Sequence, residues 1–344
     1  MNPLLSVALI GAGQIAGGYD RSPGEQEERA IYTHAGAYAK NGNFSLRTVC
    51  DLDEQRIREF QAHWGFAEGV RDSLDLCRSF HDVISVCTPD ATHHAIIKSL
   101  LESKCCKCIF VEKPVALTLD HIREIDELSN RSGIAVVVNY QRRFDAVLAG
   151  MREKLSSPSM ALLAGSGYYI KGLDHIGTTM VDTVAYLLGY PQAVLAYNKT
   201  YNRQVNEDTY EFILFYENFN LTIKSVDSRE FEYSYHVFEL DLLTREGRIC
   251  FNDNFRQIEI RRPGNYVYVG VRVLDDRHPE RVETEYDLSM LNAVAYLRDV
   301  ATGSCPHTVN TLQSAYNNKL IVDRIRQSYS SQSTLEFKRN EWKR

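Results

Sequence analysis

The first 140 residues alternate short apolar runs with amphipathic stretches, and this alternation restricts the fold more than any other feature. The runs occupy residues 5–10, 46–50, 83–86, 108–112 and 135–139. Between them, residues 54–63, 92–102 and 119–132 carry apolar side chains at three-to-four spacing, as helices covering a sheet do. Asp90 and Thr118 stand near helix starts, and Gly133 follows the last helical stretch. The pattern predicts a parallel sheet with crossover helices.

After about residue 140 the pattern changes. Residues 212–216, 221–226, 236–243 and 266–273 resemble successive strands with no helix between them, which predicts a mainly antiparallel sheet. Residues 181–188, 291–300 and 314–327 have helical periodicity. Because 344 residues exceed the usual size of one core, we predict two α/β domains, at 1–138 and 139–344. The helix near 314–327 is long enough to pack across their junction.

Charge and composition narrow the class of partner. The formal net charge is −6, whereas nucleic acids and anionic membranes recruit clustered Lys and Arg. We therefore expect a small-molecule partner, with no nucleic acid and no membrane. The chain begins with an apolar strand pattern and no basic leader, so we expect a cytoplasmic protein.

The eight cysteines fall mostly inside apolar runs, which is typical of thiols in a reducing compartment. Cys105, Cys106 and Cys108 are the one group that could hold a soft metal ion. No second pair at ligand spacing follows, so we predict a turn there and no metal.

The segment Gly11-Ala12-Gly13-Gln14-Ile15-Ala16 directly follows the first apolar run. Glycines in this context allow a tight turn and bring backbone N–H groups close to a pyrophosphate. A structural strand-to-helix turn is the alternative. We predict that residues 11–15 bind a dinucleotide.

Asp51 ends the second apolar run, where a carboxylate accepts hydrogen bonds from ribose hydroxyls and repels a 2′-phosphate. This favours NAD over NADP as the cofactor. The acid is expected about 20 residues after the glycines, and Asp51 lies 40 residues after Gly11. We attribute the excess to an inserted loop at residues 20–29. A purely structural aspartate is the alternative.

Two further motifs lie at strand ends. Thr88 and Pro89 are placed to line the cofactor and His93 to lie near its nicotinamide half, although a capped helix start explains them equally well. Glu112-Lys113-Pro114 puts a lysine where hydride chemistry would occur, and its ammonium could bind a substrate hydroxyl. A solvated lysine is the alternative.

These motifs together resemble the glucose-fructose oxidoreductase, inositol dehydrogenase and MocA (Gfo/Idh/MocA) family. The resemblance spans the glycine turn, Thr88-Pro89 with His93, Glu112-Lys113-Pro114, residues 139–144 and residues 172–189. It implies an N-terminal Rossmann domain and a C-terminal α/β domain built on a large, mainly antiparallel open sheet. That second domain is expected to bind substrate and to mediate a homodimer or homotetramer.

The resemblance implies that Lys113 is catalytic. The sequence departs from the family pattern at a second signature, which usually supplies a catalytic histidine and a nearby aspartate. The usual histidine position there holds Thr179, and the usual aspartate position holds His175. Thr cannot act as a base near neutral pH, whereas imidazole can. On a helix, His175 and Thr179 would share a face. We therefore predict Lys113 with His175 as the catalytic pair, with a core or capping role for His175 as the alternative.

Several further residues are predicted to contact substrate: Tyr140, Arg142, Arg143, Thr179 and Asp182. An arginine could hold a phosphate or carboxylate bidentately, or could form an ion pair at the domain junction. Asp182 could equally orient a neighbour.

The resulting hypothesis is an NAD-dependent oxidoreductase acting on a secondary alcohol or ketone of a sugar, sugar derivative or nucleotide-sugar. Glu112 and Lys113 would also contact the cofactor. Because Thr179 replaces the usual histidine, a non-catalytic NAD-binding regulator or assembly protein is an alternative. A reductase of C=N or C=C bonds is another.

Overall fold

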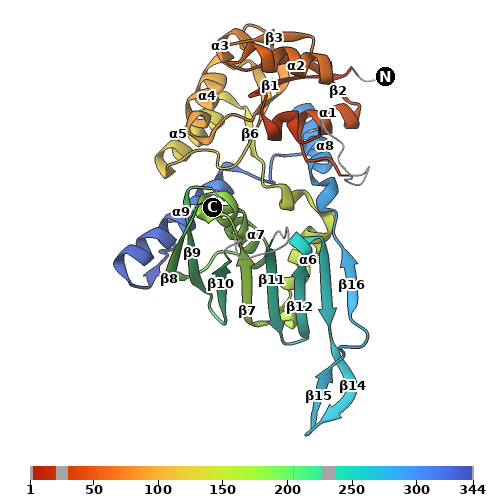
Figure 1. Cartoon of the computed structure of the whole chain (residues 1–344), viewed down its shortest axis with the longest axis vertical. Coiled ribbons are helices and arrows are strands. Elements are labelled where there is room, and N and C mark those ends of the chain that lie inside the picture. The colour runs from red at the N-terminus through yellow and green to blue at the C-terminus, as the bar shows by residue number, and fades with distance from the viewer. Residues whose placement is uncertain (1–2, 21–29, 204, 227–236, 343–344) are drawn as a thin grey trace. The chain divides into compact units, whose positions relative to one another are not determined.

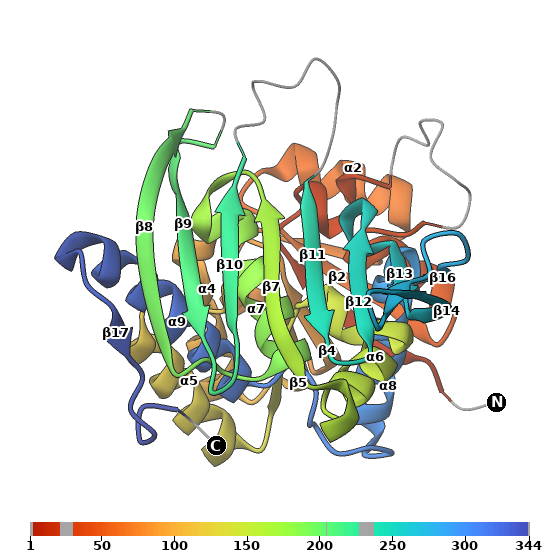
Figure 2. The same ribbon diagram turned by 90° about the horizontal axis from the view of Figure 1, so that it is seen from below.

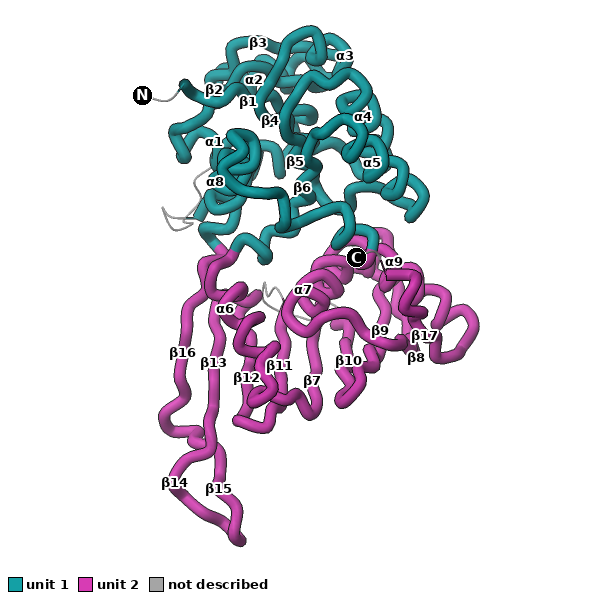
Figure 3. The backbone as a smooth tube through the Cα atoms, turned by 180° about the vertical axis from the view of Figure 1, so that it is seen from behind, with its two compact units in different colours: residues 1–144, 287–316 teal, residues 145–286, 317–344 magenta. Residues whose placement is uncertain are grey.

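A computed structural model describes residues 3–20, 30–203, 205–226 and 237–342. The chain divides into two compact units (Figure 3): residues 1–144 with 287–316, and residues 145–286 with 317–344. The chain first passes from unit 1 to unit 2 after Phe144, whereas we expected the division after residue 138. The sequence pattern did not indicate that residues 287–316 return to the first unit, because periodicity predicts a helix but not the sheet that it covers.

Unit 1 contains a six-stranded parallel sheet in the order β3-β2-β1-β4-β5-β6 (Figure 1). This is the strand order of a Rossmann fold. Its strands are β1 (Leu5–Ile10), β2 (Phe44–Cys50), β3 (Glu68–Val70), β4 (His81–Val86), β5 (Cys106–Val111) and β6 (Ala135–Val138). The helices are α1 (His34–Asn41), α2 (Glu54–Trp64), α3 (Ser73–Leu76), α4 (Asp90–Ser103), α5 (Leu119–Ser132) and α8 (Ser289–Thr302). The five predicted strands and three predicted helices of this half are confirmed, with small shifts of their ends.

The core of unit 1 explains why β4 and β5 appear as unbroken apolar runs. Helices cover both faces of a parallel sheet, so successive side chains of a central strand are all buried. Ile84, Ile109 and Val111 pack with α4 and α5, whereas Val83, Cys108 and Phe110 pack in the cluster that contains α1 and α8. Thr118 caps α5 and Gly133 ends it in the left-handed conformation, as predicted.

Unit 2 contains a nine-stranded sheet in the order β16-β13-β12-β11-β7-β10-β9-β8-β17. Every pair in it is antiparallel except β7 with β10, so the sheet is mixed and mostly antiparallel. Its strands are β7 (Leu162–Tyr169), β8 (Ala193–Asn202), β9 (Glu207–Phe215), β10 (Asn220–Ser225), β11 (Phe238–Thr244), β12 (Gly247–Asn252), β13 (Gln257–Arg261), β16 (Glu280–Glu283) and β17 (Leu335–Glu336). The predicted strand at 236–243 begins with a residue outside the described ranges.

Helices lie against one face of this sheet (Figure 2). They are α6 (Ala146–Leu155), α7 (Thr178–Leu188) and α9 (Leu312–Ser331). The division between the units falls within α9, after Tyr316.

The predicted strand at residues 266–273 is wrong. The chain there forms a hairpin of β14 (Pro263–Tyr268) and β15 (Val271–Leu274), which extends beyond the other strands of unit 2 (Figure 1). Val269 and Gly270 connect the strands, both with positive φ, as a tight hairpin turn requires. The run of β-branched residues concealed this turn, and Gly270 was the signal for it.

Candidate cofactor and active site

The glycine turn lies where β1 ends and the sheet reverses its strand order between β1 and β4, the position at which such sheets bind ligands. Gly11 has φ +92°, and a Cβ there would lie 2.8 Å from the backbone carbon and oxygen of Cys87. Gly11 is therefore needed for the approach of β1 to β4. Gly13 has φ −89° and nothing within 4 Å of a Cβ position, so packing does not require it. Its missing side chain leaves the backbone open to a ligand.

A cavity of about 800 Å³ lies beside this turn. Among the residues that border it are Gly11 and Gly13 after β1, Asp51 after β2, and Thr88 and Pro89 after β4. An open backbone and a carboxylate on one cavity fit a dinucleotide, since the first admits a pyrophosphate and the second a ribose. After residues 14–18, which form one π-helical turn, the next helix among the described residues is α1, which begins at His34. Most of the predicted inserted loop, residues 21–29, lies outside the described residues.

Asp51 connects β2 to the glycine turn. Its carboxylate oxygens accept hydrogen bonds from the backbone N–H of Ala12 at 2.7 Å and of Asp53 at 2.9 Å. The carboxylate is thus held in place before any ligand binds, and each of its oxygens can accept a further bond.

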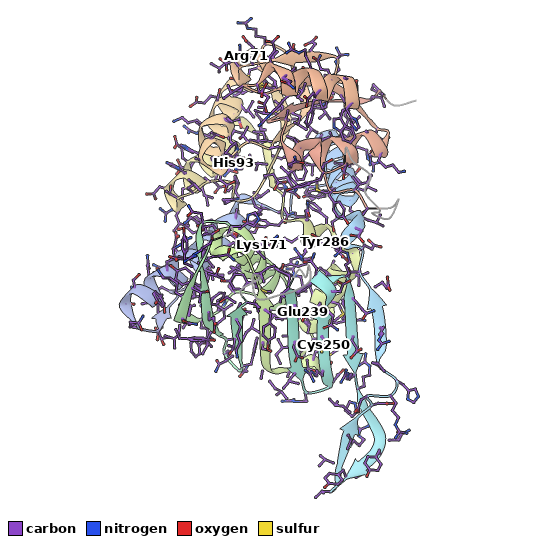
Figure 4. All side chains as sticks on the ribbon, in the orientation of Figure 1. Arg71, His93, Lys171, Glu239, Cys250 and Tyr286 are labelled. Carbon is purple, nitrogen blue, oxygen red and sulfur yellow. The ribbon has the colours of Figure 1, made fainter. Side chains whose placement is uncertain are left out.

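Two arginines that sequence reasoning missed also line this cavity. Arg56 lies on α2 and is paired with Asp53 at 3.7 Å, and Arg71 donates to the carbonyl of Leu52 at 3.3 Å. Arg71 is labelled in Figure 4. The cavity therefore combines cations with Asp51. Arg71 follows β3, a strand of three residues that is too short for periodicity to reveal.

His93 does not border the cavity but holds two loops together. Its ring is completely buried, with Nδ1 2.8 Å from the carbonyl oxygen of Pro114 and Nε2 2.8 Å from that of Thr88. His93 thus joins the segment after β4 to the segment after β5. A contact with the cofactor remains a prediction, and this geometry favours an indirect role.

Glu112 and Lys113 follow β5. The Glu112 Oε1 atom accepts a hydrogen bond from Asn139 Nδ2 at 2.6 Å and lies 2.9 Å from Nε2 of His34. Burial by itself would raise the pKa of Glu112, but the bonds from His34 and Asn139 and the charge of Lys113 bring it below its ordinary value of 4.5. Lys113 is partly exposed. The anion beside the proposed catalytic lysine is therefore fixed and ionised.

The predicted substrate residues after β6 differ in their exposure. Tyr140 and Arg142 are buried, and Arg143 is partly exposed with its guanidinium 5.7 Å from the ring centre of Tyr140. Tyr140 also anchors the chain, because its carbonyl accepts a hydrogen bond from Asn310 at 3.1 Å.

In unit 2, His175 lies in a π-helical turn, Gly172–Gly177, that leads directly into α7. π-Helical turns are rare and often occur at functional sites. The His175 side chain is exposed. The backbone N–H groups of Asp174 and His175 donate to the carboxylate of Glu207. Asp174 is also ion-paired with Arg326 of α9. The turn is therefore anchored on two sides while the imidazole stays accessible.

Thr179 and Asp182 follow on α7. Thr179 is partly exposed, one turn after His175, and its carbonyl accepts a bond from Thr183. Asp182 is buried and accepts a hydrogen bond from Asn318 at 2.5 Å. Contact with substrate remains a prediction for both residues.

The described residues contain neither a metal-binding cluster nor a helix suited to cross a membrane. Within those ranges, no three or more His, Cys, Asp or Glu side chains are placed to hold a metal ion. Cys105 instead lies 3.2 Å from Cys77, sulfur to sulfur. Among the helices that the structure describes, none has the length and apolar character to cross a bilayer.

The residues that border this cavity lie in a segment that matches a known family. Residues 5–140 match the GFO_IDH_MocA family, an oxidoreductase family with an NAD-binding Rossmann fold. D-glucoside 3-dehydrogenase of Escherichia coli is 26% identical over 208 residues, which cover 54% of this chain and 55% of the relative. Myo-inositol 2-dehydrogenase of Thermotoga maritima is 25% identical over 113 residues, 33% of each protein. The chain thus spans about half or less of these curated relatives.

Comparison of structures extends the likeness of fold to both units. A levoglucosan dehydrogenase solved with NADH and levoglucosan has a TM-score of 0.78 at 18% identity, covering 96% of this chain and 99% of that one. At that identity the likeness shows the fold alone. The sequence match lies on the strands and turns that build the cavity, and it is residues 5–140 that match the GFO_IDH_MocA family of oxidoreductases.

Proposed function

We propose that this chain is an NAD-dependent oxidoreductase that acts on a secondary alcohol or ketone of a sugar, sugar derivative or nucleotide-sugar. The observation that carries the proposal is the cavity at the sheet's switch point, where an open glycine backbone faces an anchored carboxylate. The relatives named as dehydrogenases of a glucoside and of inositol support the substrate class.

The residues divide between the two ends of the cofactor. Gly11, Ala12, Gly13, Gln14 and Ile15 would hold the pyrophosphate, and Asp51 the adenosine ribose. Thr88, Pro89, Glu112 and Lys113 would lie along the nicotinamide half, with His93 behind them. Bound NAD would supply the hydride acceptor.

The chain's own part in the reaction is the proton. Lys113 would accept the proton of the substrate hydroxyl as the alcohol is oxidised and return it in the reverse direction. His175 would serve the same hydroxyl, because Thr179 has no basic group. Tyr140, Arg142, Arg143, Thr179 and Asp182 would shape the substrate pocket.

Lys113→Ala tests the catalytic assignment. We expect turnover of a sugar panel to fall by about 10²–10⁴-fold while the affinity for NAD, measured by calorimetry, changes little. Lys107→Ala is the matched control, because Lys107 lies on β5 near its other end, where it pairs with Asp82. Undiminished turnover in Lys113→Ala would overturn the assignment.

Thr179→His separates an enzyme from a binding-only protein. If the chain is a catalyst with a displaced histidine, we expect Thr179→His to restore part of the activity that His175→Ala removes. A regulator or assembly protein would bind NAD and gain no turnover from the change.

The preference for NAD over NADP depends on Asp51. We expect Asp51→Ala to weaken NAD binding and to narrow the gap to NADP, because the carboxylate that repels a 2′-phosphate is gone. Arg71→Ala should leave NAD affinity nearly unchanged. The opposite result would be a wild type that binds NADP more tightly than NAD and an Arg71→Ala variant that no longer binds NADP. It would show that the cofactor preference is for NADP.

We also propose that the protein is a homo-oligomer, a homodimer or homotetramer, working in the cytoplasm. Tyr266, Tyr268, Val269 and Val271 of the β14–β15 hairpin are 64–82% exposed. Exposed apolar groups of this extent are typical of protein interfaces, and a two-stranded hairpin alone is marginally stable. All eight cysteines are free, as expected in a reducing compartment.

A further inference from the structure

His34, the first residue of α1, belongs to a buried polar chain that leads to Glu112. The His34 ring is completely buried, with Nε2 2.9 Å from Glu112 Oε1 and Nδ1 3.0 Å from Ser85 Oγ. Ser85 Oγ in turn lies 2.8 Å from the hydroxyl of Tyr38, and both of these residues are also completely buried. Polar groups in such a place cost free energy unless each has a partner.

The donors in this chain have a direction. An ionised carboxylate can only accept, so His34 Nε2 carries a hydrogen and donates it to Glu112. Nδ1 of the same ring lies within hydrogen-bond distance of the Ser85 hydroxyl, which is in turn hydrogen-bonded to the Tyr38 hydroxyl. Asn139 donates to the same Glu112 oxygen. The Glu112 side chain keeps 14% exposure, so the chain leads from the core to the surface beside Lys113.

Packing alone does not require a histidine here. The ring of His34 lies 4.6 Å from that of Phe110, centre to centre, a contact that a phenyl ring would make as well. The imidazole is required by Glu112 and Ser85.

The groups around Glu112 leave few charges to compete. Burial and the neighbouring charge of Glu112 raise the pKa of the Cys87 thiol well above its usual range. Burial likewise raises the pKa of Cys108 to about 12 and that of Tyr38 still further. These three groups therefore stay neutral.

We propose that His34 is a positioning residue that holds Glu112 as a fixed, ionised partner beside Lys113. This inference rests on the proposed function, in which Lys113 moves the substrate proton. His34 touches neither substrate nor cofactor in this role and acts through Glu112. Without the hydrogen bond from His34, the largely buried Glu112 carboxylate takes up a proton, and the anion beside Lys113 is lost.

The test reads Glu112 directly and needs no substrate. In protein labelled with ¹³C at the glutamate carboxyls, the Glu112 resonance is assigned by its absence from Glu112→Gln. We expect it to stay ionised between about pH 5 and pH 8 in the wild type and to titrate within that range in His34→Phe. His34→Gln, which retains a donor, should restore the ionised state.

Ser85→Ala is the matched control, because it breaks the chain beyond His34. It should lower stability and leave the Glu112 titration unchanged, whereas a merely structural role for His34 predicts the same behaviour for both variants. If His34→Phe does not fold, His34→Asn replaces it, since its shorter side chain cannot reach Glu112. An unchanged Glu112 titration in the folded variant overturns the inference.

The pH profile of kcat/KM then separates this inference from the proposed function. In His34→Phe, its acid limb should move along the pH axis by at least about one unit, and His34→Gln should reverse the shift. No turnover by the wild type would count against the proposed function, while the carboxyl titration would still decide the role of His34. Turnover with an unmoved acid limb would count against His34 alone.

Discussion

Alanine is expected to have different effects at Gly11 and at Gly13. Substituting each glycine in turn therefore separates the stability of the fold from the binding of NAD. At Gly11, alanine meets two penalties. The left-handed backbone costs about 1–2 kcal/mol for a residue with a Cβ. The Cβ would also lie 2.8 Å from the Cys87 carbonyl group and 3.0 Å from the Thr88 nitrogen.

Those neighbours are backbone atoms at the end of β4, so none of them can rotate away. Forced overpacking of this kind costs about 1–3 kcal/mol. We therefore expect Gly11→Ala to lower the free energy of unfolding of unit 1 by about 2–5 kcal/mol. Gly13→Ala should change it by less than about 1 kcal/mol, because its φ is ordinary and the space is empty. Gly13→Ala should, however, weaken NAD binding at least about tenfold, because its methyl group covers the backbone that faces the ligand.

The assay is urea unfolding followed by tryptophan fluorescence, because the two tryptophans lie in different units. Trp64 ends α2 in unit 1 and Trp342 lies in unit 2. In a Trp342→Phe background the signal reports unit 1 alone, and calorimetry measures NAD binding. A wild-type unfolding midpoint for Gly11→Ala would refute the argument from close approach. A destabilised Gly13→Ala with wild-type NAD affinity would show that Gly13 serves the fold instead.

Three further predictions follow from charge and exposure. Because the pKa of Glu112 is lowered in the fold, its ionised form stabilises the protein above about pH 4.5, and this contribution should be lost as pH falls through the folded value. Glu112→Gln should therefore flatten the acid side of a urea-midpoint profile, and an unchanged slope would contradict the prediction. Burial raises the pKa of Glu207, so its contribution has the opposite sign, and stability should fall as pH rises through its folded value. Glu207→Gln should remove that slope, measured through Trp342 in Trp64→Phe. The double substitution Val269→Asp with Val271→Asp should dissociate the oligomer to monomers in sedimentation equilibrium. Leu52→Asp changes an exposed residue of unit 1 and should leave the oligomer intact. Equal masses for the wild type, the double variant and Leu52→Asp would exclude the hairpin as an interface.

The sequence by itself determined the parallel sheet of unit 1 and the residues at its switch point. Both-faced burial makes β4 and β5 unbroken apolar runs, and the glycine turn and Asp51 follow strand patterns that local periodicity reveals. Such features depend on neighbours in the chain. The turn at Val269–Gly270 was also local, but the apolar run around it concealed the signal.

Tertiary structure decided the contacts between residues far apart in the sequence. His34 lies 78 positions before Glu112 and carries no motif of its own, and only the packing of α1 on the sheet shows that it bonds the carboxylate beside Lys113. His93 was predicted from its motif to lie near the cofactor, and only the tertiary structure shows that its ring also bridges Thr88 and Pro114. Residues 287–316 belong to unit 1 because of contacts with residues far away in the sequence. Periodicity describes a helix, but the surface that the helix covers depends on the whole fold.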